Sequence, residues 1–481
     1  MNVGTLPARH GRYRPAHPAL VTETGRVTFA DFDRRTARLA AALQARGITR
    51  GGAIATVLPN GAALYETYWA AARIGAATVP LSPLLRADAA LALASDADAA
   101  LVLSAASEVE ALMESVAIDA VPTVPDMAPG DAFNIMYSSG TTGTPKGIVL
   151  SYGVRAAYCT LFAAHWRMTP ESVVLHAGSL VFNGAFVTMM PAMFLGATFV
   201  LLKQFDAGSV IRAIEREQVT HVMMVPSQLV ALLNAPGFDP ARLASLQMLG
   251  SVGAPLHREH RDRLISLLPD RLYELYGLTE GFVTVLDRRD FAERRDSVGR
   301  PAAFSDMRIV DGDGVDVAAG IVGEIVGRGP LLMSGYYKRP DLTAEALVDG
   351  WLRSGDLGFV DADGFLHLVD RQKDLIVSGG VNVYPRDIEE IAVSHADVRE
   401  AAVFGVPDEK WGEAPIAALI LREGASTTAD ALAAWINERV AARYQRVSAV
   451  VLLDDFPRST AGKTLKRVLR APYWASRTQQ M

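Results

Sequence analysis

Residues 136–152 read MYSSGTTGTPKGIVLSY. The span from Ser138 to Gly147 holds three glycines, five hydroxyl side chains and one lysine. It does not match the triphosphatase loop G-x-x-x-x-G-K-[ST], because Pro145 precedes Lys146 and Gly147 follows it. Its residues nevertheless suit phosphate, since glycine lets the backbone approach closely, hydroxyls donate hydrogen bonds and lysine carries a positive charge. Taken alone, the stretch is either a linker or a phosphate-binding loop.

Helices and strands alternate on both sides of this loop. Thr28 is a typical helix cap and Gly47 a typical helix stop, which predicts a helix over residues 29–45. Several of the predicted strands are apolar on both faces, which favours parallel sheets covered by helices on both sides. The predicted strands lie at 53–59, 77–81, 197–202 and 221–226, and the other predicted helices at 62–75, 210–219 and 228–234.

The pattern changes after about residue 295. Short strands between Asp-Gly and Gly turns predict an antiparallel or barrel-like β piece. From Asp374 onward the sequence predicts a compact α+β segment, with the boundary near Asp370–Lys373. The fold class is therefore α/β, with a large N-terminal domain of parallel-rich sheets flanked by helices, and a small α+β C-terminal domain. The late strands are expected at 307–317, 323–329, 364–371, 401–406, 415–421 and 449–454, with a helix at 429–444.

The bulk properties exclude several classes of protein. The chain has 481 residues, is half apolar and carries a net charge of −6, which gives no reason to expect nucleic acid or an anionic membrane as a partner. The single cysteine, Cys159, excludes an internal disulfide framework and fits a reducing cytoplasm. No stretch approaches ~18 uninterrupted apolar residues, so no membrane span is expected. The segment 181–202 reads as a buried helix followed by a strand.

Four further stretches carry polar residues next to glycine turns: SVGAPL (251–256), LYELYGLTEG (272–281), RSGDLG (353–358) and PRSTAGKTLKRVLR (457–470). We expect Asp356 in a tight turn, and Lys463 beside a glycine close to the end of the chain. Each stretch alone has an ordinary explanation, because an Asp in a turn bonds its own backbone and a Lys in a basic run is usually solvated. Their order and spacing along one chain is much more specific.

Together these motifs make the chain resemble the acyl-adenylate-forming superfamily, which includes acyl- and aryl-CoA ligases, stand-alone adenylation domains and firefly-type luciferases. The resemblance is strongest to a bacterial acyl-CoA ligase and extends from ALVTETGRVTFADF (19–32) to GKTLKRVLR (462–470). In that superfamily YSSGTTGTPKG is the mobile phosphate loop. The resemblance implies ATP, Mg²⁺ and coenzyme A as cofactors.

The resemblance also implies a role for each matching position. The phosphates of ATP would be lined by Ser138, Ser139, Gly140, Thr141, Thr142, Gly143 and Lys146. The adenine would be flanked by Gly253, Ala254 and Pro255, with Tyr276 stacked on it, and Asp356 would accept the ribose hydroxyls with help from Arg371. The catalytic positions would be Thr279 at the α-phosphate, Glu280 on Mg²⁺ and Lys463 as the adenylation lysine. Lys373 would be the hinge, within 371–373, between domains 1–370 and 374–481, and Gly380 would line the pantetheine tunnel.

The acid pocket is expected to be mostly apolar and to hold no cation for a second carboxylate. Its candidates are Phe182, Asn183, Phe186, Gly250, Ser251, Gly281, Phe282 and Val283. Amino-acid-activating relatives carry an aspartate near Asn183, so an α-amino acid is not expected. Asn183 either bonds a substrate hydroxyl or holds the backbone. The histidine that many relatives carry near Val181–Phe182 is missing, which puts gating in that region in doubt.

These residues fit the activation of a carboxylic acid with ATP. Attack of a carboxylate on the α-phosphate brings two anions together, and a metal ion and lysines neutralise that charge. We expect an acid–thiol ligase that makes acyl-AMP and then an acyl-CoA from a hydrophobic aryl, alicyclic or medium-chain monocarboxylate. The alternative is an enzyme that loads the acid onto a separate phosphopantetheinyl carrier protein. A degenerate binding protein is a third alternative, but it would have lost Lys463, Glu280 or Asp356, and all three are present.

Overall fold

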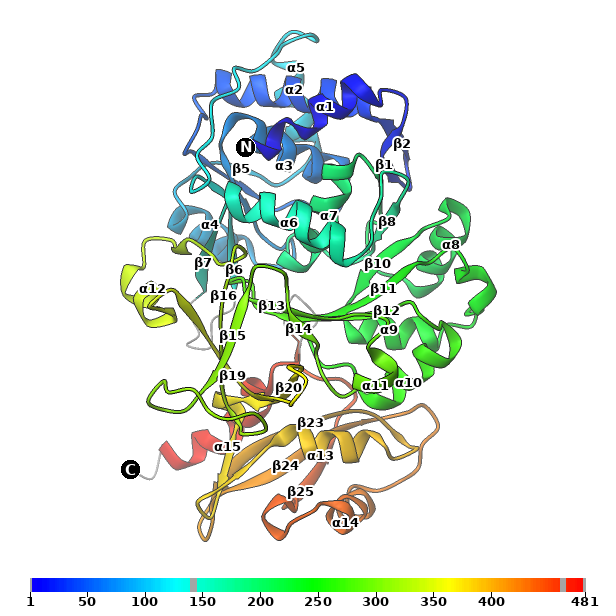
Figure 1. Ribbon diagram of the computed structural model, residues 1–481, viewed down its shortest axis with the longest axis vertical. Coiled ribbons are helices and arrows are strands. Elements are labelled where there is room, and N and C mark those ends of the chain that lie inside the picture. Colours follow the sequence, from blue (N-terminus) through cyan, green and yellow to red (C-terminus); the bar gives the residue numbers. More distant parts are fainter. Residues whose placement is uncertain (1, 139–144, 459–463, 479–481) are drawn as a thin grey trace.

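The computed structural model describes residues 2–138, 145–458 and 464–478 (Figure 1). Five of the predicted phosphate-loop residues and Lys463 therefore lie outside the described residues. Two large sheets with their helices make up the N-terminal part, an antiparallel sheet follows, and a small sheet with its own helices lies at the other end of the molecule (Figure 1). Among the described helices, none combines the length and the apolar character needed to cross a membrane.

The largest sheet has nine strands in the order β14-β13-β12-β11-β10-β8-β9-β1-β2. Its central strands pair in parallel and are joined by helices, as the alternation in the sequence predicts. The bounds are β1 Pro18–Thr22, β2 Gly25–Thr28, β8 Val173–His176, α7 Asn183–Leu195, β9 Thr198–Leu201, α8 Ala207–Glu217, β10 His221–Met224, α9 Pro226–Leu233, β11 Met248–Val252, α10 Arg258–Leu267, β12 Leu272–Gly277, β13 Val283–Leu286, α11 Phe291–Arg294 and β14 Arg300–Pro301.

The second sheet has six strands in the order β17-β7-β6-β4-β3-β5. The glycine- and hydroxyl-rich loop after Ser138 joins β6 to β7, and Ser138 pairs with Lys146, so the two ends of the loop are neighbours in an antiparallel hairpin. The predicted helix 29–45 is confirmed, and the Thr28 hydroxyl accepts the Asp31 N–H at 3.2 Å. The bounds are α1 Leu6–Tyr13, α2 Phe29–Ala45, β3 Ala53–Thr56, α3 Ala62–Ile74, β4 Ala77–Pro80, α4 Ala87–Asp96, β5 Ala99–Leu103, α5 Ala106–Glu114, β6 Ala132–Ser138, β7 Lys146–Ser151, α6 Tyr152–His165 and β17 Gly335–Tyr336.

The third sheet is antiparallel, as predicted, and it corrects the placement of Asp356. This residue lies within strand β19 (Trp351–Val360) and not in a tight turn. Gly355 has φ +68°, a backbone conformation that glycine adopts without strain, and the strand continues through it as a bulge. The register to β16 shifts between Glu324 and Val326 at the same place. The other elements are β15 Asp306–Val310, β16 Gly323–Arg328, α12 Pro340–Ala346, β18 Leu347–Val348 and β20 Leu366–Arg371.

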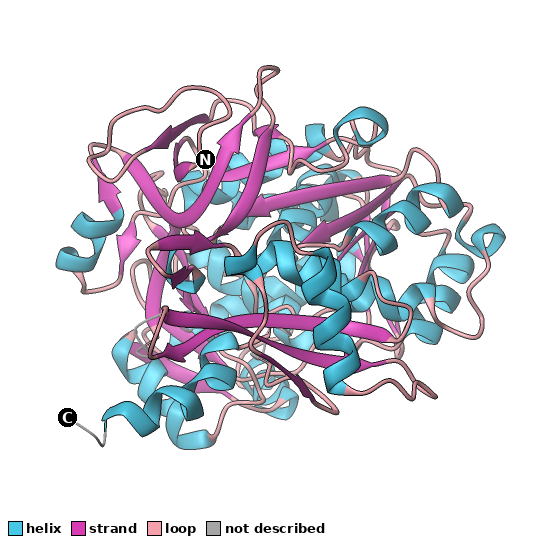
Figure 2. Ribbon diagram, turned by 90° about the horizontal axis from the view of Figure 1, so that it is seen from below, coloured by secondary structure: helices cyan, strands magenta, loops and turns pink. Residues whose placement is uncertain are grey.

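The C-terminal sheet, of order β22-β21-β24-β23 with β25 on β24, is covered on both faces. Successive residues of a strand point to opposite faces, so Val403 joins one hydrophobic cluster, with α13 and α14, while Phe404 joins another, with α15. Figure 2 shows helices packed against the long strands of this sheet. Gly379 and Gly380, with φ +61° and +80°, form the two-residue turn between β21 and β22. The bounds are β21 Ile376–Ser378, β22 Val381–Val383, α13 Pro385–Val393, β23 Val398–Asp408, β24 Gly412–Leu421, α14 Ala429–Arg439, β25 Ala449–Leu452 and α15 Lys466–Thr478.

The predicted helix at 429–444 is too long, because α14 ends at Arg439 and Val440 is extended. The side chain of Asn437 accepts the Val447 N–H at 2.7 Å and donates to the Val447 carbonyl at 3.0 Å. These two bonds hold the chain that leads into β25 against the end of the helix, so the chain turns back instead of continuing.

A buried ion pair joins α10 to β12. The Arg261 guanidinium lies 3.1 Å from the Glu274 carboxylate, and the two side chains are only 4% and 6% exposed. Burial raises the pKa of Glu274, and the nearby Arg261 opposes that shift. Arg261 also donates to the Leu256 carbonyl at 3.0 Å, so it fixes the segment after β11 as well.

Replacing Arg261 by methionine is therefore expected to lower the free energy of unfolding by about 3–5 kcal/mol, because Glu274 is left as an unpaired buried charge. Urea unfolding followed by tryptophan fluorescence measures the change. Arg86→Met, which removes an exposed arginine paired with Asp88, is the matched control and should change stability little. The double variant Arg261→Met/Glu274→Leu should recover most of the loss, and equal instability of the single and double variants would contradict this account.

Candidate nucleotide- and acid-binding site

The first cluster of candidate residues lies where β12 meets the antiparallel sheet. The Tyr276 hydroxyl donates to one carboxylate oxygen of Asp356 at 2.8 Å, and Nε of Arg371 lies 3.4 Å from the other. Asp356 and Arg371 are paired across β19 and β20, which keeps them side by side. Burial, and then the charge of Asp356, raises the pKa of Tyr276 well above its usual value, so the phenol keeps its proton. The carboxylate is thus fixed at the edge of the aromatic ring.

The second cluster brings the phosphate-loop lysine close to Glu280. The Tyr336 hydroxyl donates to Oε1 of Glu280 at 2.9 Å, and Nζ of Lys146 lies 5.0 Å from the centre of the Tyr336 ring. Burial raises the pKa of Tyr336, and the charge of Glu280 raises it further. Tyr336 therefore acts as a neutral bridge between a cation and an anion that are far apart in the sequence.

The chain around Glu280 has little freedom to move. Its carbonyl accepts the Met333 N–H at 2.7 Å, which ties the turn after β12 to the segment before β17. A Cβ at the next residue, Gly281, would lie 2.2 Å from the Leu331 carbonyl oxygen, so only glycine fits there. Thr279 and Glu280 form the turn that follows β12, three and four residues after Tyr276. One strand therefore places both clusters.

The predicted adenine-flanking residues also lie at this edge. Strand β11 is parallel to β12, with Val252 beside Leu275. Gly253, Ala254 and Pro255 follow β11 directly and are half-buried or exposed. The carboxyl ends of parallel strands meet at one edge of a sheet, which is where ligands bind in open α/β folds.

The acid-pocket candidates fall into two groups. A Cβ at Gly184 would lie 3.9 Å from a methyl group of Val252, so the start of α7, with half-buried Phe182 and Asn183, lies beside the end of β11. Gly250 and Ser251 belong to β11 and are buried. Three of the remaining candidates, Phe186, Phe282 and Val283, pack in the main hydrophobic core, and Gly281 directly follows Glu280.

The structure places a cation beside Asn183 that the sequence analysis did not name. Arg155, on α6, is fully buried, and its Nη1 donates to Oδ1 of Asn183 at 3.0 Å. Sequence reasoning missed Arg155 because no motif contains it. The available signal was one charged residue in a helix that is otherwise uncharged, YGVRAAYCTLFAAH. Tyr336 was missed in the same way.

The predicted hinge lies in a short 3₁₀ helix, Gln372–Asp374, between β20 and β21, and Lys373 is exposed. Just before it, Asp370 accepts the Arg371 N–H at 2.7 Å and the Arg386 N–H at 3.1 Å. Burial raises the pKa of Asp370 to about 6. Lys466, on α15, pairs with Glu389 at 2.6 Å. Charged groups therefore surround the point where the chain enters the C-terminal sheet.

The predicted tunnel residue Gly380 is exposed at the tip of the β21–β22 hairpin. The Trp411 ring packs beside the neighbouring Gly379, where a Cβ would lie 2.8 Å from the ring. On either side of the segment that contains Lys463, Arg458 and Thr464 form an antiparallel bridge.

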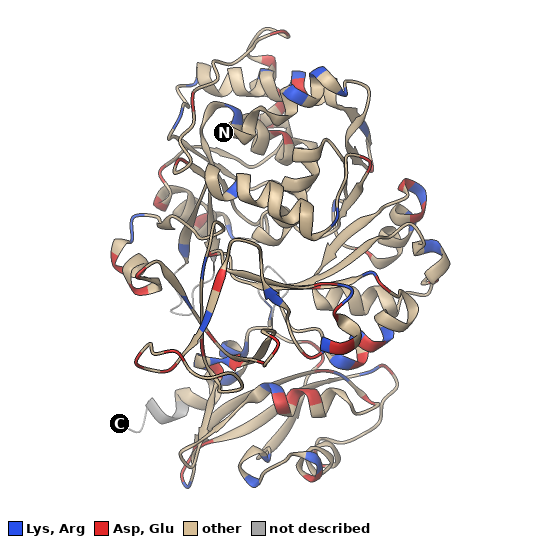
Figure 3. Cartoon of the chain, viewed as in Figure 1, with Lys and Arg blue, Asp and Glu red and all other residues tan. Residues whose placement is uncertain are grey.

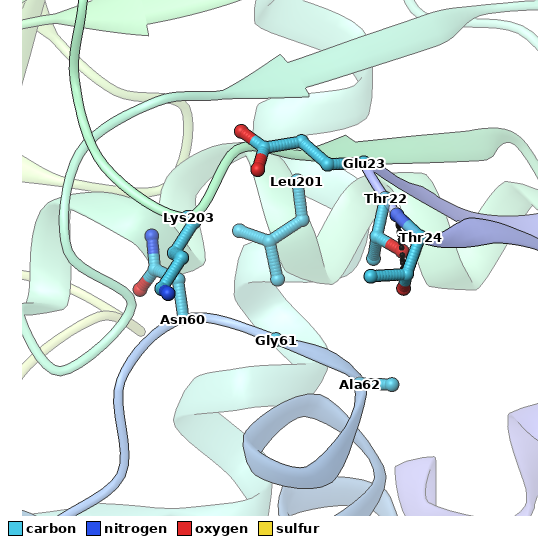
Figure 4. Close-up of a pocket in the computed structure, with 8 residues that line it drawn as sticks. All are labelled: Thr22, Glu23, Thr24, Asn60, Gly61, Ala62, Leu201 and Lys203. Atoms are coloured by element: carbon cyan, nitrogen blue, oxygen red, sulfur yellow. Dashed lines mark hydrogen bonds between the residues drawn. The ribbon is translucent and has the colours of Figure 1, made fainter.

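A cavity of about 100 Å³ lies elsewhere, between the β1–β2 turn and the start of α3 (Figure 4). It contains none of the candidate residues. Asn60, which lines it, donates to the carbonyls of Gly178 and Leu202 and accepts the Leu180 N–H at 2.9 Å. This side chain fixes the segment that leads into α7, and so helps to hold Asn183, the first residue of that helix, in position. The cavity is lined by Thr22, Glu23, Thr24, Asn60, Gly61, Ala62, Leu201 and Lys203.

Comparison with known proteins identifies the family. The AMP-binding enzyme family matches residues 8–337, and the AMP-binding enzyme C-terminal domain matches residues 387–463. The chain therefore belongs to the AMP-binding enzymes.

Three relatives illustrate the match. A feruloyl-CoA synthase of an Amycolatopsis species is 36% identical over 492 residues, covering 97% of this chain and 98% of that protein. An indoleacetate–CoA ligase of Aromatoleum aromaticum is 33% identical, with 96% of both chains covered. The crystal structure of ATP-bound MatB from Rhodopseudomonas palustris is 27% identical and superposes with a TM-score of 0.89, covering 98% of this chain and 99% of that one.

Proposed function

We propose that the chain is an ATP- and Mg²⁺-dependent acid–thiol ligase, which joins a carboxylic acid to coenzyme A through an acyl-AMP intermediate. The observation that carries this function is the convergence of Tyr276–Asp356–Arg371 and Lys146–Tyr336–Glu280 at the end of β12. The first cluster suits a nucleoside and the second suits a metal-bound phosphate. The CoA-ligase relatives support the same conclusion.

The nucleoside is held by Asp356 and Tyr276. Asp356 accepts the two ribose hydroxyls, because a carboxylate is an acceptor with several lone pairs and Tyr276 and Arg371 hold it in place. The Tyr276 ring stacks on the adenine, with Gly253, Ala254 and Pro255 at its border. These three lie beyond the end of β11, at the same edge of the sheet as the end of β12.

The donor set around Glu280 fits Mg²⁺. This ion prefers oxygen ligands, keeps several waters and is usually held by one or two carboxylates plus substrate phosphates. The described residues contain no cluster of three or more His, Cys, Asp or Glu that could hold a metal alone, which suits an ion shared with ATP. Glu280 would hold it, with Tyr336 fixing one carboxylate oxygen. When bound, the ion neutralises phosphate charge and acts as a Lewis acid.

Adenylation is an in-line displacement at the α-phosphate. The carboxylate oxygen of the acid attacks phosphorus, and the bond to the bridging oxygen of pyrophosphate breaks. Thr279 hydrogen-bonds the α-phosphate, and the leaving group is received by Ser138, Ser139, Gly140, Thr141, Thr142, Gly143 and Lys146. Lys463 contacts both the incoming carboxylate and the α-phosphate, which aligns them and offsets their repulsion.

Thioester formation needs a different access route, because the thiol must reach the acyl carbon. We propose that domain 374–481 rotates against domain 1–370 about the hinge 371–373, with Lys373 as the pivot, and that Gly380 then lines the path of the pantetheine arm. The separate hydrophobic clusters of the small domain support this division. CoA is the expected acceptor, and a phosphopantetheinyl carrier protein is the alternative, because both present the same thiol.

The acid is a hydrophobic aryl, alicyclic or medium-chain carboxylate, and aryl acids are favoured by the names of the two CoA-ligase relatives. Phe182, Asn183 and the end of β11 border it. The cytoplasm, with its ATP and its reducing conditions, is the proposed location.

A screen of carboxylic acids tests the function directly. Pyrophosphate release is measured with ATP, Mg²⁺ and each acid, and acyl-CoA is then detected by mass spectrometry. No pyrophosphate release with any acid would overturn the proposal. Release without acyl-CoA, together with transfer to a carrier protein, would support the alternative acceptor.

Asp356→Ala is expected to lower kcat/KM for ATP by at least ~10²-fold, because two hydrogen bonds to a charged acceptor are lost at about 1.5–3 kcal/mol each. ATP titration by calorimetry and initial rates of pyrophosphate release measure the effect. Asp363→Ala, an exposed position in the turn between β19 and β20, is the control and should retain activity. Unchanged ATP affinity in Asp356→Ala would remove this residue from the site.

A further inference from the structure

Arg155 is a buried cation that has no acidic partner among the described residues. Its side chain is fully buried, and none of the carboxylates in the described part of the chain lies within ion-pair distance. It is the single Lys or Arg of α6, and α7, which packs against α6, has none (Figure 3). Burial lowers the pKa of Arg155 to about 10, so it keeps its charge at neutral pH.

The neighbours of Arg155 are neutral. Nε and Nη2 donate to Oδ1 of Asn134 at 3.2 and 3.0 Å, and Nη1 donates to Oδ1 of Asn183 at 3.0 Å. The guanidinium carbon lies 4.1 Å from the centre of the Phe186 ring and 4.7 Å from that of Tyr158. By contrast, Arg261 is equally buried but contacts Glu274.

An unpaired buried charge destabilises a fold, whereas leucine or methionine fills the same volume without that cost. The presence of arginine here therefore has no explanation in packing alone. The cluster also has more hydrogen-bond donors than acceptors, because Nδ2 of Asn134 is buried and finds no acceptor among the described residues. A ligand group with negative charge or lone pairs would balance this cluster.

Arg155 also fixes the orientation of Asn183. A guanidinium only donates, so the amide atom that faces it is the oxygen, and the amide nitrogen points the other way. That nitrogen donates to the Tyr158 hydroxyl at 3.0 Å. It carries a second N–H, for which the described residues provide no hydrogen-bond acceptor. Asn134, Arg155 and Tyr158 are fully buried, and Asn183 is the member of the cluster with some exposure.

We propose that Asn183, oriented by Arg155, presents an N–H donor to the acid and selects acids that carry an acceptor oxygen away from the reacting carboxylate. The acceptor is an ether, hydroxyl or carbonyl oxygen, or a second carboxylate. This rests on the proposed function, in which the start of α7 borders the acid. An α-ammonium group is rejected, because it would meet an N–H donor backed by a buried cation.

A matched set of aryl acids tests this specificity. The probes are 3-phenylpropanoic acids with a methoxy group at ring position 2, 3 or 4, each compared with its ethyl isostere, which has the same shape but no acceptor. At one ring position the methoxy acid is expected to have about tenfold higher kcat/KM for pyrophosphate release than the ethyl acid. The 4-carboxy acid forms a further arm, and its preference over methoxy would identify an anionic acceptor.

Three variants separate a role of Arg155 and Asn183 in acid selection from a general loss of activity. Asn183→Leu and Arg155→Met should bring the methoxy-to-ethyl ratio close to one while the ethyl acid is still activated. Asn183→Asp places a carboxylate beside Arg155, so it should raise the melting temperature and still lose the preference, because it offers no N–H. Arg86→Met, an exposed arginine, is the control and should keep the ratio.

The outcomes distinguish this inference from the function on which it rests. Suppose that acids are adenylated but the methoxy-to-ethyl ratio is near one in the wild type, or that the wild-type ratio persists in Asn183→Leu and Arg155→Met. Either result would overturn the proposed selection by Asn183 and leave the ligase function standing. If Arg155→Met fails to fold, the ratios in Asn183→Leu and Asn183→Asp decide. If no acid of any kind releases pyrophosphate, both are overturned.

Discussion

Replacing Lys463 by alanine is expected to slow acyl-AMP formation by ~10²–10³, the loss seen when one preorganised charge-stabilising donor is removed, or about 3–4 kcal/mol. The same variant, given pre-made acyl-AMP and CoA, is expected to form the thioester at a nearly normal rate. The reason is geometric, because after the proposed rotation this lysine lies away from the reacting carbon.

The two half-reactions are measured separately, by single-turnover pyrophosphate release and by acyl-CoA formation from the isolated adenylate. Lys203→Ala is the matched control, since this lysine is exposed and lines the cavity that contains none of the candidate residues. Equal damage to both half-reactions would mean that a single fixed arrangement performs both steps, and the rotation would have to be abandoned.

Lys373→Pro is expected to leave a single-turnover burst of acyl-AMP and to slow thioester formation by orders of magnitude. Lys373 lies in the 3₁₀ helix Gln372–Asp374. Proline fixes φ near about −65°, which matches the φ of a 3₁₀ helix, and it also restricts the residue before it. A pivot that must change φ to reach a second arrangement is therefore blocked at this position.

Misfolding is the competing outcome for this variant, so it must first show an unchanged melting curve and normal ATP binding. Lys373→Ala is the matched comparison, because it removes the side chain but leaves the backbone free to turn. A folded proline variant that makes acyl-CoA at the wild-type rate would show that the pivot lies elsewhere.

The parts of the fold that were predicted well depend on local signals. The helix at 29–45 follows from the Thr28 cap and the Gly47 stop, and the parallel strands follow from short apolar runs between helices. Where local rules failed, a neighbour in space decided the outcome. The tight turn expected at Asp356 does not form, because pairing with β16 and β20 on both sides keeps β19 extended through this residue. Asn437, through Val447, shortens α14.

The same contrast between local sequence signals and contacts distant in sequence applies to the candidate site. Tyr276, Glu280 and Asp356 could be named because they stand in motifs, and the structure brings Tyr276 and Asp356 into contact. Arg155 and Tyr336 stand in no motif. The role of each depends on one partner distant in the sequence: Arg155 contacts Asn183, 28 residues away, and Tyr336 contacts Glu280, 56 residues away. Such contacts form only in the folded chain, and no local sequence pattern predicts them.

The double-sided packing of the C-terminal sheet has an energetic consequence. Because α13 and α14 cover one face and α15 the other, the proposed rotation would leave the core of this unit covered. The free-energy difference between two orientations then depends on a few surface contacts, such as His257 with Glu390 and Arg422 with Glu259. Contacts of that kind are worth little individually. If the proposed rotation occurs, its two orientations would therefore be almost equally populated, and the ligand present at each stage of the cycle would decide which one prevails.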